Sequence, residues 1–409
     1  MFIQKPYSPR MTVSLTPLVM VWLASSACSQ EYSPVIEDRV ESGLVQAPVI
    51  ESDPGPKPSG GWDLGVVVSA AYNDNIFLSS SNPESDMVFR VAPIVAYTKG
   101  NATEGEGWFV KGGYRPTLVV YASHGSENRV DQQALLVAGW RGKVTRVTYS
   151  GGVEKLGDAT AETGRPTDRL DFQNEIRVAW IPREKVTLEA AVGDTESDYS
   201  DPAYYDSGKT YGEVTARYAY SPKTEIGLAY QVGRVRVEDS PNQDTQQLTA
   251  QVAWAPREKF RVAINVGAEH RRVDGQSDVN PVLEGGVYWS PRKGTDLYLT
   301  GYMREEVSVF YAGQNYSVRG FTAGISQRLN HEWTAKLEGG YEKDCYQQVS
   351  GSGTSGRRDN IWFLRPALVY QLSDESDLSL YYRISGDDSN EQDFGYSQQI
   401  LGVELNHIF

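Results

Sequence analysis

Trp254-Ala-Pro-Arg-Glu-Lys259 is followed directly by Phe260-Arg-Val-Ala-Ile-Asn-Val-Gly-Ala268, and these two segments together indicate how the chain folds. Its first part is an aromatic residue followed by a tight polar turn. In its second part apolar and polar residues alternate, which is the period of a β-strand with two different faces. The segment before it, Gln247–Trp254, alternates in the same way. The stretch therefore predicts a β-hairpin with an aromatic residue near the turn.

The aromatic-and-turn phrase recurs roughly every 35 to 40 residues, which indicates a string of similar hairpins. An aromatic residue near one end of many strands is typical of the girdles at the two surfaces of a membrane. The recurrences are Trp180–Lys185, Tyr220–Glu225 and Trp289–Gly294, and looser versions are Trp140–Lys143, Gln327–Asn330 and Tyr370–Asp374.

The alternating segments predict an all-β fold: an antiparallel transmembrane β-barrel of about 18 strands, with about 16 as the alternative. Each segment is long enough to cross a bilayer when tilted, and an even number of strands places both ends of the barrel on one side. The predicted strands are 62–73, 86–98, 107–122, 129–141, 144–157, 168–181, 185–198, 207–220, 224–238, 243–255, 259–273, 278–289, 295–309, 315–328, 333–347, 359–372, 377–387 and 393–409.

The composition alone would suit a soluble protein, with 22% charged residues and a mean hydropathy of −0.45. A membrane barrel has the same profile because only alternate residues of its strands face lipid. No stretch is long and apolar enough for a membrane-spanning helix. The net charge of −14 argues against a nucleic-acid partner, because such proteins carry a basic patch.

Three regions follow one another along the chain. Residues 1–29 have the basic, apolar and small-residue segments of a secretory signal peptide. Residues 30–61 are rich in proline and glycine and predict a disordered periplasmic leader, and 62–409 form the barrel. If Cys28 leaves with the signal, Cys345 stays alone and no internal disulfide forms; a lipidated Cys28 is the alternative.

The ends of the strands predict the orientation of the barrel. Because the chain enters from the periplasm, the tight aromatic turns are expected on the periplasmic side and the other connections outside. The outer connections are short, and no long loop folded inward as a pore constriction is evident. The last strand ends in alternating apolar residues and an aromatic, which indicates an outer-membrane assembly signal at Leu405 and Phe409; His407 departs from that pattern.

A resemblance to a known family rests on Tyr72–Ser79, which contains Asn-Asp-Asn-Ile-Phe, and on the following strand entry Ser85–Pro93. These segments resemble the start of the outer-membrane proteins known as putative β-barrel porins, some of which are associated with exopolysaccharide and exosortase systems. The resemblance covers the barrel. It implies an outer-membrane barrel and a pore, and it supplies no catalytic residues.

Charged residues at alternate strand positions are predicted to point into the lumen, because a base near the bilayer midplane costs up to about 2–4 kcal/mol in lipid. They either line a water-filled channel and set its selectivity or pair with one another as structural salt bridges. Inward tyrosines such as Tyr298, Tyr302 and Tyr381 either stack on sugar rings or pack within the lumen. The lumen candidates are Arg90, Lys111, Arg115, Arg177, Arg217, Arg261, Arg304, Lys336, Arg365, Arg383, Glu175, Glu189, Glu213, Glu284 and Glu338.

Signals for catalysis or cofactors are weak. Gly351–Gly356 matches the glycine spacing of a dinucleotide loop but is followed by a strand rather than a helix, which favours a flexible loop. The acidic group within 387–393 is expected to be solvated, with calcium binding as the alternative. His124 lies in a loop with no orienting partner marked by the sequence. We therefore expect no catalytic residues, no metal site and no cofactor.

These observations predict a non-enzymatic, porin-like outer-membrane channel through which small polar or saccharide solutes diffuse. The alternative is a non-catalytic component of an exopolysaccharide export or surface-assembly system, in which the leader docks a periplasmic partner. A structural or adhesive barrel is a third class. The expected partners are outer-membrane lipid, the barrel assembly machinery and the solutes, whereas the solute and the oligomeric state are left open.

Overall fold

The computed structural model describes residues 60–100, 106–347, 356–391 and 393–409. These residues form 18 strands and one short 3₁₀ helix, η1 (Gly125–Glu127). The strands are β1 (Gly60–Asn73), β2 (Asp86–Gly100), β3 (Gly107–Tyr121), β4 (Arg129–Arg141), β5 (Thr145–Leu156), β6 (Arg169–Arg183), β7 (Val186–Tyr199), β8 (Ser207–Ser221), β9 (Thr224–Val237), β10 (Gln243–Arg257), β11 (Phe260–Val273), β12 (Gln276–Arg292), β13 (Thr295–Val307), β14 (Asn315–Arg328), β15 (Trp333–Tyr346), β16 (Arg358–Gln371), β17 (Ser376–Asp387) and β18 (Tyr396–Ile408).

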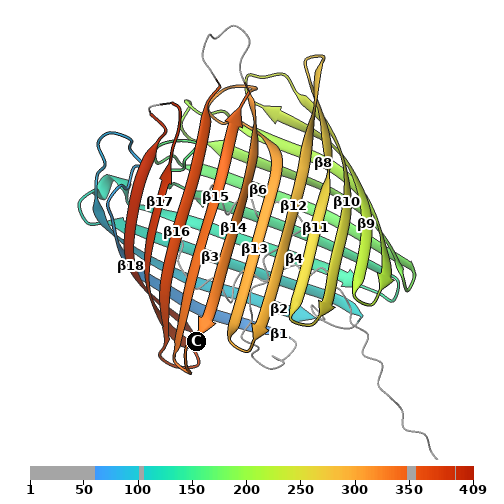
Figure 1. Ribbon diagram of the computed structural model, residues 1–409, viewed down its shortest axis with the longest axis horizontal. Coiled ribbons are helices and arrows are strands. Elements are labelled where there is room, and N and C mark those ends of the chain that lie inside the picture. The colour runs from blue at the N-terminus through green and yellow to red at the C-terminus, as the bar shows by residue number, and fades with distance from the viewer. Residues whose placement is uncertain (1–59, 101–105, 348–355, 392) are drawn as a thin grey trace, which may run out of the picture.

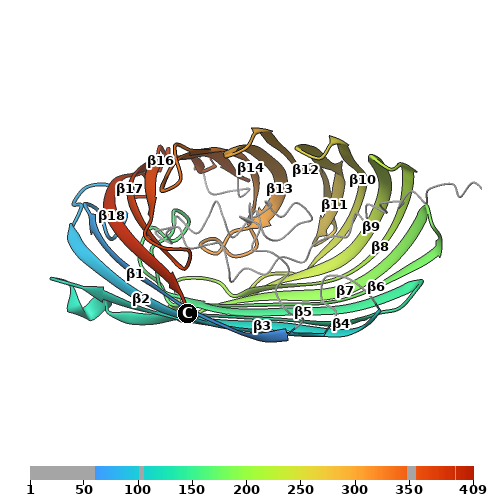
Figure 2. The same ribbon diagram turned by 90° about the horizontal axis from the view of Figure 1, so that it is seen from below.

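The 18 strands close into one antiparallel barrel. Each strand pairs with its neighbours in the sequence, and β1 pairs with both β2 and β18, which closes the sheet. The tilted wall is seen from the side in Figure 1, and the closed, oval ring is seen from below in Figure 2. Closure matters because every strand then satisfies its backbone hydrogen bonds without leaving an edge exposed to lipid.

The sequence prediction of 18 strands is confirmed, and the alternative of 16 is excluded. Most predicted boundaries lie within two residues of those observed. The largest differences are at the end of β12, which continues to Arg292, and at the start of β18, which begins at Tyr396. The strand β1 begins at Gly60, so it includes the last two residues that were assigned to the leader. Residues 1–59, with the predicted signal peptide and the rest of the leader, lie outside the described residues.

The recurring aromatic-and-proline phrase forms a β-bulge at each turn. The register of the hairpins shifts between Trp180 and Arg183, between Trp254 and Arg257, and between Trp289 and Arg292. Proline has no N–H to donate to a ladder, and a bulge is a place where that donor is not needed. The repeated phrase therefore ends the regular pairing at the same level of neighbouring hairpins.

The outer wall carries the pattern that a bilayer requires. Exposed tryptophans mark its lower rim near the short turns, and exposed tyrosines and phenylalanines mark its upper part. Exposed leucine, isoleucine and valine lie between the two rows, and no helix in the described part of the chain is apolar and long enough to cross a membrane. The lower row is Trp62, Trp108, Trp140, Trp180, Trp254 and Trp289, and the upper row is Tyr72, Phe89, Tyr114, Tyr230, Phe321, Tyr341 and Tyr382.

The two ends of the barrel differ in their connections. The start of β1 and the end of β18 lie at the end with the short turns, at the bottom of Figure 1, and the longer loops gather at the top. The short turns thus lie at the same end as the two termini of the barrel, as predicted, and their periplasmic location stays a prediction. His407, which departs from the pattern of the assembly signal, has local partners on this strand end. Its ring lies 2.8 Å from the Ser376 hydroxyl and packs edge-on against Phe409.

Gly267 on β11 is required where β10 and β11 approach closely. A Cβ at this position would collide with the Leu248 carbonyl oxygen, whereas a Cβ at Gly112 on β3 would have its nearest neighbour 3.7 Å away. We predict that Gly267→Ala lowers the free energy of unfolding by roughly 1–3 kcal/mol because the ladder must shift. Urea titration of the detergent-solubilised barrel measures this loss. Gly112→Ala is the matched control, and equal stability of the two variants would contradict the prediction.

Candidate functional site

The interior wall of the barrel carries the charged residues that the sequence placed there. Along each strand they alternate with exposed apolar residues of the outer wall; Arg177, for example, lies between Ile176 and Val178, which face outward. The same alternation places all the predicted lumen candidates on the inner face. Their contribution to selectivity stays a prediction.

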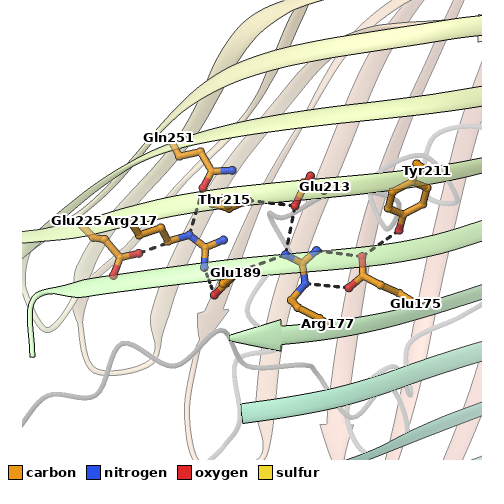
Figure 3. A network of polar contacts seen from close by, with 9 residues as sticks. All are labelled: Glu175, Arg177, Glu189, Tyr211, Glu213, Thr215, Arg217, Glu225 and Gln251. Atoms are coloured by element: carbon orange, nitrogen blue, oxygen red, sulfur yellow. Dashed lines mark hydrogen bonds and ion pairs between the residues drawn. The ribbon is translucent and has the colours of Figure 1, made fainter. Parts of the chain in front are cut away.

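A continuous network of polar contacts connects inner residues of five neighbouring strands, β6 to β10 (Figure 3). Arg177 lies 2.9 Å from Glu175 and 3.2 Å from both Glu189 and Glu213. Arg217 lies 2.7 Å from Glu189. Further members at the ends of the network are Tyr211, which donates to Glu175, Gln251, which accepts from Arg217, and Glu225, 3.9 Å from Arg217.

The network explains how these charges are tolerated inside the barrel. The side chains of Glu189 and Glu213 are only 5% and 9% exposed, and each contacts a guanidinium. Removing one member of such a buried pair leaves a desolvated charge, which costs more than the pair itself contributes. Within the network, the two guanidiniums of Arg177 and Arg217 serve the four carboxylates Glu175, Glu189, Glu213 and Glu225.

On the other side of the barrel, arginines stack on aromatic side chains. Arg365 lies 4.8 Å from the ring centre of Tyr381, and Arg304 lies 5.2 Å from that of Tyr302. The same contact joins Arg261 with Tyr288 and Arg383 with Phe363. A guanidinium over an aromatic face is attracted by the ring, so the stack fixes the position of the cation while the ring itself adds no opposite charge.

The inward tyrosines are packed rather than presented to solutes. Tyr302 and Tyr381 are 5% and 2% exposed, and the Tyr302 hydroxyl donates to Glu342 over 2.5 Å. Tyr298 donates to Glu338 over 2.6 Å. Of the two interpretations given by the sequence, the structure therefore favours packing within the lumen for these three residues over stacking on sugars.

Loops from opposite walls meet at the extracellular end, where the sequence predicted no inward-folded constriction; that expectation was wrong. The loop after β5 and the loop after β13 both lie within the ring in Figure 2. The Val309 amide donates to the Glu162 carboxylate over 3.1 Å, although the two residues are 147 positions apart. The Tyr205 amide donates to the Val309 carbonyl, and the Tyr204 hydroxyl donates to the Thr163 carbonyl. We call Ala161, Glu162, Thr163, Tyr204, Val309, Phe310, Arg357 and Phe394 the mouth cluster.

Arg357 fastens the mouth cluster to the wall. Its guanidinium donates to the Ala161 carbonyl over 3.0 Å, pairs with Asp359 at 2.7 Å and lies over the Phe394 ring. The side chain is 1% exposed. Phe394 in turn packs edge-on against Phe310, so three loops are held by one buried cation. Sequence reasoning missed Arg357 because it follows a glycine- and serine-rich segment with no strand periodicity.

We predict that Arg357→Ala detaches the loop after β5 from the loop before β16. The buried carbonyl of Ala161 and the Asp359 carboxylate would lose their common partner, at a cost of roughly 1–3 kcal/mol for each unsatisfied group. Single-channel recordings should show a larger mean conductance and more frequent transitions than the wild type. Arg272→Ala, which removes an outward-facing arginine of β11, is the control. Identical recordings from Arg357→Ala and the wild type would show that the mouth cluster does not limit the passage.

His124 has two carboxylate partners, which the sequence did not indicate. Its ring nitrogens lie 2.8 Å from Asp86 and 2.8 Å from Glu84, and the backbone amide of Ser123 also donates to Asp86. Hydrogen bonds to Asp86 and then to Glu84 raise the pKa of His124 above its usual value of 6.5. The pair connects the loop after β1 with the loop after β3, and its role is that of a loop anchor.

The raised pKa of His124 predicts a pH-dependent anchor. A histidine whose folded pKa is raised contributes stability that is fully present below its unfolded pKa and is lost as the pH rises through the folded pKa. Intrinsic-rate-corrected amide exchange in residues 122–128 should therefore become faster as the pH rises above neutrality. His124→Gln should remove this dependence. A loop with the same protection at mildly acidic and alkaline pH would contradict the assignment.

The acidic group, the cysteine and the glycine-rich motif that the sequence singled out form no metal-binding or catalytic cluster among the described residues. Asp387 of the acidic group is buried at the end of β17, and no three or more His, Cys, Asp or Glu residues of the described ranges are arranged to hold a metal ion. Cys345 is a free cysteine. Most of the Gly351–Gly356 motif lies outside the described residues.

Comparisons with known proteins found one matching family model and several similar solved structures. Residues 278–408 match the family model described as "Putative beta-barrel porin 2". Among solved structures, OccAB3 of Acinetobacter baumannii is similar at 10% identity and a TM-score of 0.48, over 86% of this chain and 99% of that chain. OpdK of Pseudomonas aeruginosa, solved with vanillate, is similar at 13% identity and a TM-score of 0.46, over 85% and 99%. No curated protein matches.

The closed barrel and its two aromatic girdles define a β-barrel of the outer-membrane type, and its strands β12 to β18 match the β-barrel porin family model. The resemblance to β-barrel porins is confirmed by this match, which lies in strands β12 to β18 rather than at the Tyr72–Pro93 segment where the sequence suggested it.

Proposed function

We propose that this barrel is a channel for the diffusion of small polar or saccharide solutes, narrowed at its extracellular end by the mouth cluster. The observation that carries the proposal is the charged inner wall of an 18-stranded barrel. Barrels of 16 to 18 strands are about the size that leaves an aqueous passage, because side chains alone do not fill them. Wetted charges on the wall then select solutes by charge and hydrogen bonding.

The proposal includes no covalent chemistry. Ser376 and His407 form the serine–histidine contact that a hydrolase would need, at 2.8 Å, but in the described part of the chain no carboxylate orients that histidine. His124 does have carboxylate partners, and these partners fix loops. The proposal also keeps residues 1–29 as a secretory signal and the following segment as a periplasmic leader, which N-terminal sequencing of the membrane-extracted protein would test.

Replacing lumen arginines should change ion selectivity. Arg261 is exposed to the lumen and stacks on Tyr288, so Arg261→Gln removes a wetted positive charge. Arg304 lies 2.6 Å from Glu306, so Arg304→Gln unmasks a carboxylate. We predict that both variants shift the reversal potential in a salt gradient toward cation selectivity.

The matched control is Arg236→Gln, which removes an outward-facing arginine of β9 and should leave the reversal potential unchanged. If Arg261→Gln and Arg304→Gln both left conductance and reversal potential as in the wild type, these arginines would not line the conducting path.

A further inference from the structure

The outer wall over β14, β15 and β16 is layered in a particular order. The exposed apolar residues Ile325 and Leu337 lie lowest, and Phe321 and Tyr341 lie above them, directly opposite each other with ring centres 6.3 Å apart. One layer higher, two residues further along each strand, come Arg319 and Lys343. The order from bilayer to solvent is therefore aliphatic, aromatic and basic, which is the order of a membrane interface with anionic head groups.

Three basic side chains meet in this upper layer. Arg319 and Lys343 are directly opposite each other in the β14–β15 ladder. Arg358 on β16 is opposite Cys345, two residues above Lys343, so it is diagonal to Lys343. Like charges directly opposite each other on neighbouring strands are destabilising when nothing neutralises them. We call Arg319, Lys343 and Arg358 the basic outer patch.

The neighbouring acids do not neutralise the basic outer patch. Glu305 on β13 is 8% exposed, and its carboxylate accepts from the Gln347 side chain. Asp388 contacts β16 through its backbone, which hydrogen-bonds to Asn360, and its carboxylate forms no ion pair with the three basic residues among the described residues. Among the described residues, no ion pair involves any of the three basic side chains, and Arg319 has only a long contact of 3.9 Å to the Cys345 sulfur. The sequence of 348–355, Gln-Val-Ser-Gly-Ser-Gly-Thr-Ser, adds no acid.

Another part of the outer wall shows what a neutralised arrangement looks like. On β9 and β10, the outward-facing Arg234 lies 2.8 Å from Asp244, above the girdle residue Tyr230. The positive charge of Arg234 is thus neutralised by a carboxylate of the protein itself. The basic outer patch lacks such a partner, so its partner is expected to come from the membrane.

We propose that the basic outer patch binds the phosphate groups of a phosphorylated glycolipid in the outer leaflet. Arginine presents a planar fork of donors that matches phosphate, and lysine adds a point charge, so Arg319, Lys343 and Arg358 suit a head group with two phosphates. The sugar rings would rest at the level of Phe321 and Tyr341, and the acyl chains would follow the aliphatic rows below. This site rests on the outer-membrane location and is independent of the channel proposal.

The test is native mass spectrometry of the refolded, full-length barrel titrated with bisphosphorylated lipid A. The variant Arg319→Gln/Lys343→Gln/Arg358→Gln should bind it about a hundredfold more weakly, since each basic residue near an anionic surface contributes about fivefold. The affinity of the wild type should fall with added salt. It should also fall when the same glycolipid is dephosphorylated, because the phosphates are the groups recognised.

The matched control is Arg234→Gln/Arg236→Gln/Arg272→Gln, which removes three outward-facing arginines from β9 and β11. It should bind lipid A as the wild type does. Heat-modifiable migration in gels shows that each variant is folded. Wild-type affinity in the patch variant, or equal affinity for the dephosphorylated lipid, would overturn the proposal. Planar-bilayer conductance of the same variants tests the channel separately, so failure of one proposal is distinguishable from failure of the other.

Discussion

The bilayer offers no hydrogen-bond partners, so every backbone N–H and C=O that crosses it must be satisfied within the protein. A closed sheet meets this requirement, and the pairing of β1 with β18 closes this one. Closure imposes a period of two on every strand, because successive side chains face lipid and lumen in turn. The apolar outer wall, the charged inner wall and the girdles all follow from that alternation.

The inner wall then has its own electrostatic constraint. Charges that cannot face lipid gather in the lumen, where the walls desolvate them partly. Shared ion-pair partners stabilise these charges: Arg177 contacts three carboxylates, and Glu189 lies between two guanidiniums. The two interpretations given by the sequence, lumen lining and structural pairing, are therefore not exclusive. The network holds β6 to β10 together, while stacked arginines such as Arg261 keep charge available to solutes.

The strands and the inner face could be predicted from sequence because they depend on local alternation and on turns such as Trp254–Lys259. The mouth cluster could not. Val309 and Glu162 come from distant hairpins, and Arg357 follows a segment with no period, so no local pattern marks their meeting. The same limit applies to His124, whose partner Asp86 lies across a loop. Tyr302 and Tyr381 were placed on the correct face, but their burial depends on neighbouring strands.

We propose that solutes pass through the barrel under the control of the mouth cluster. Single-channel conductance of the refolded protein in a planar bilayer, with a salt gradient across it, tests this most directly. We expect stable open steps with a defined reversal potential, and larger steps for Arg357→Ala. A barrel that is folded yet silent, both as wild type and as Arg357→Ala, would contradict it.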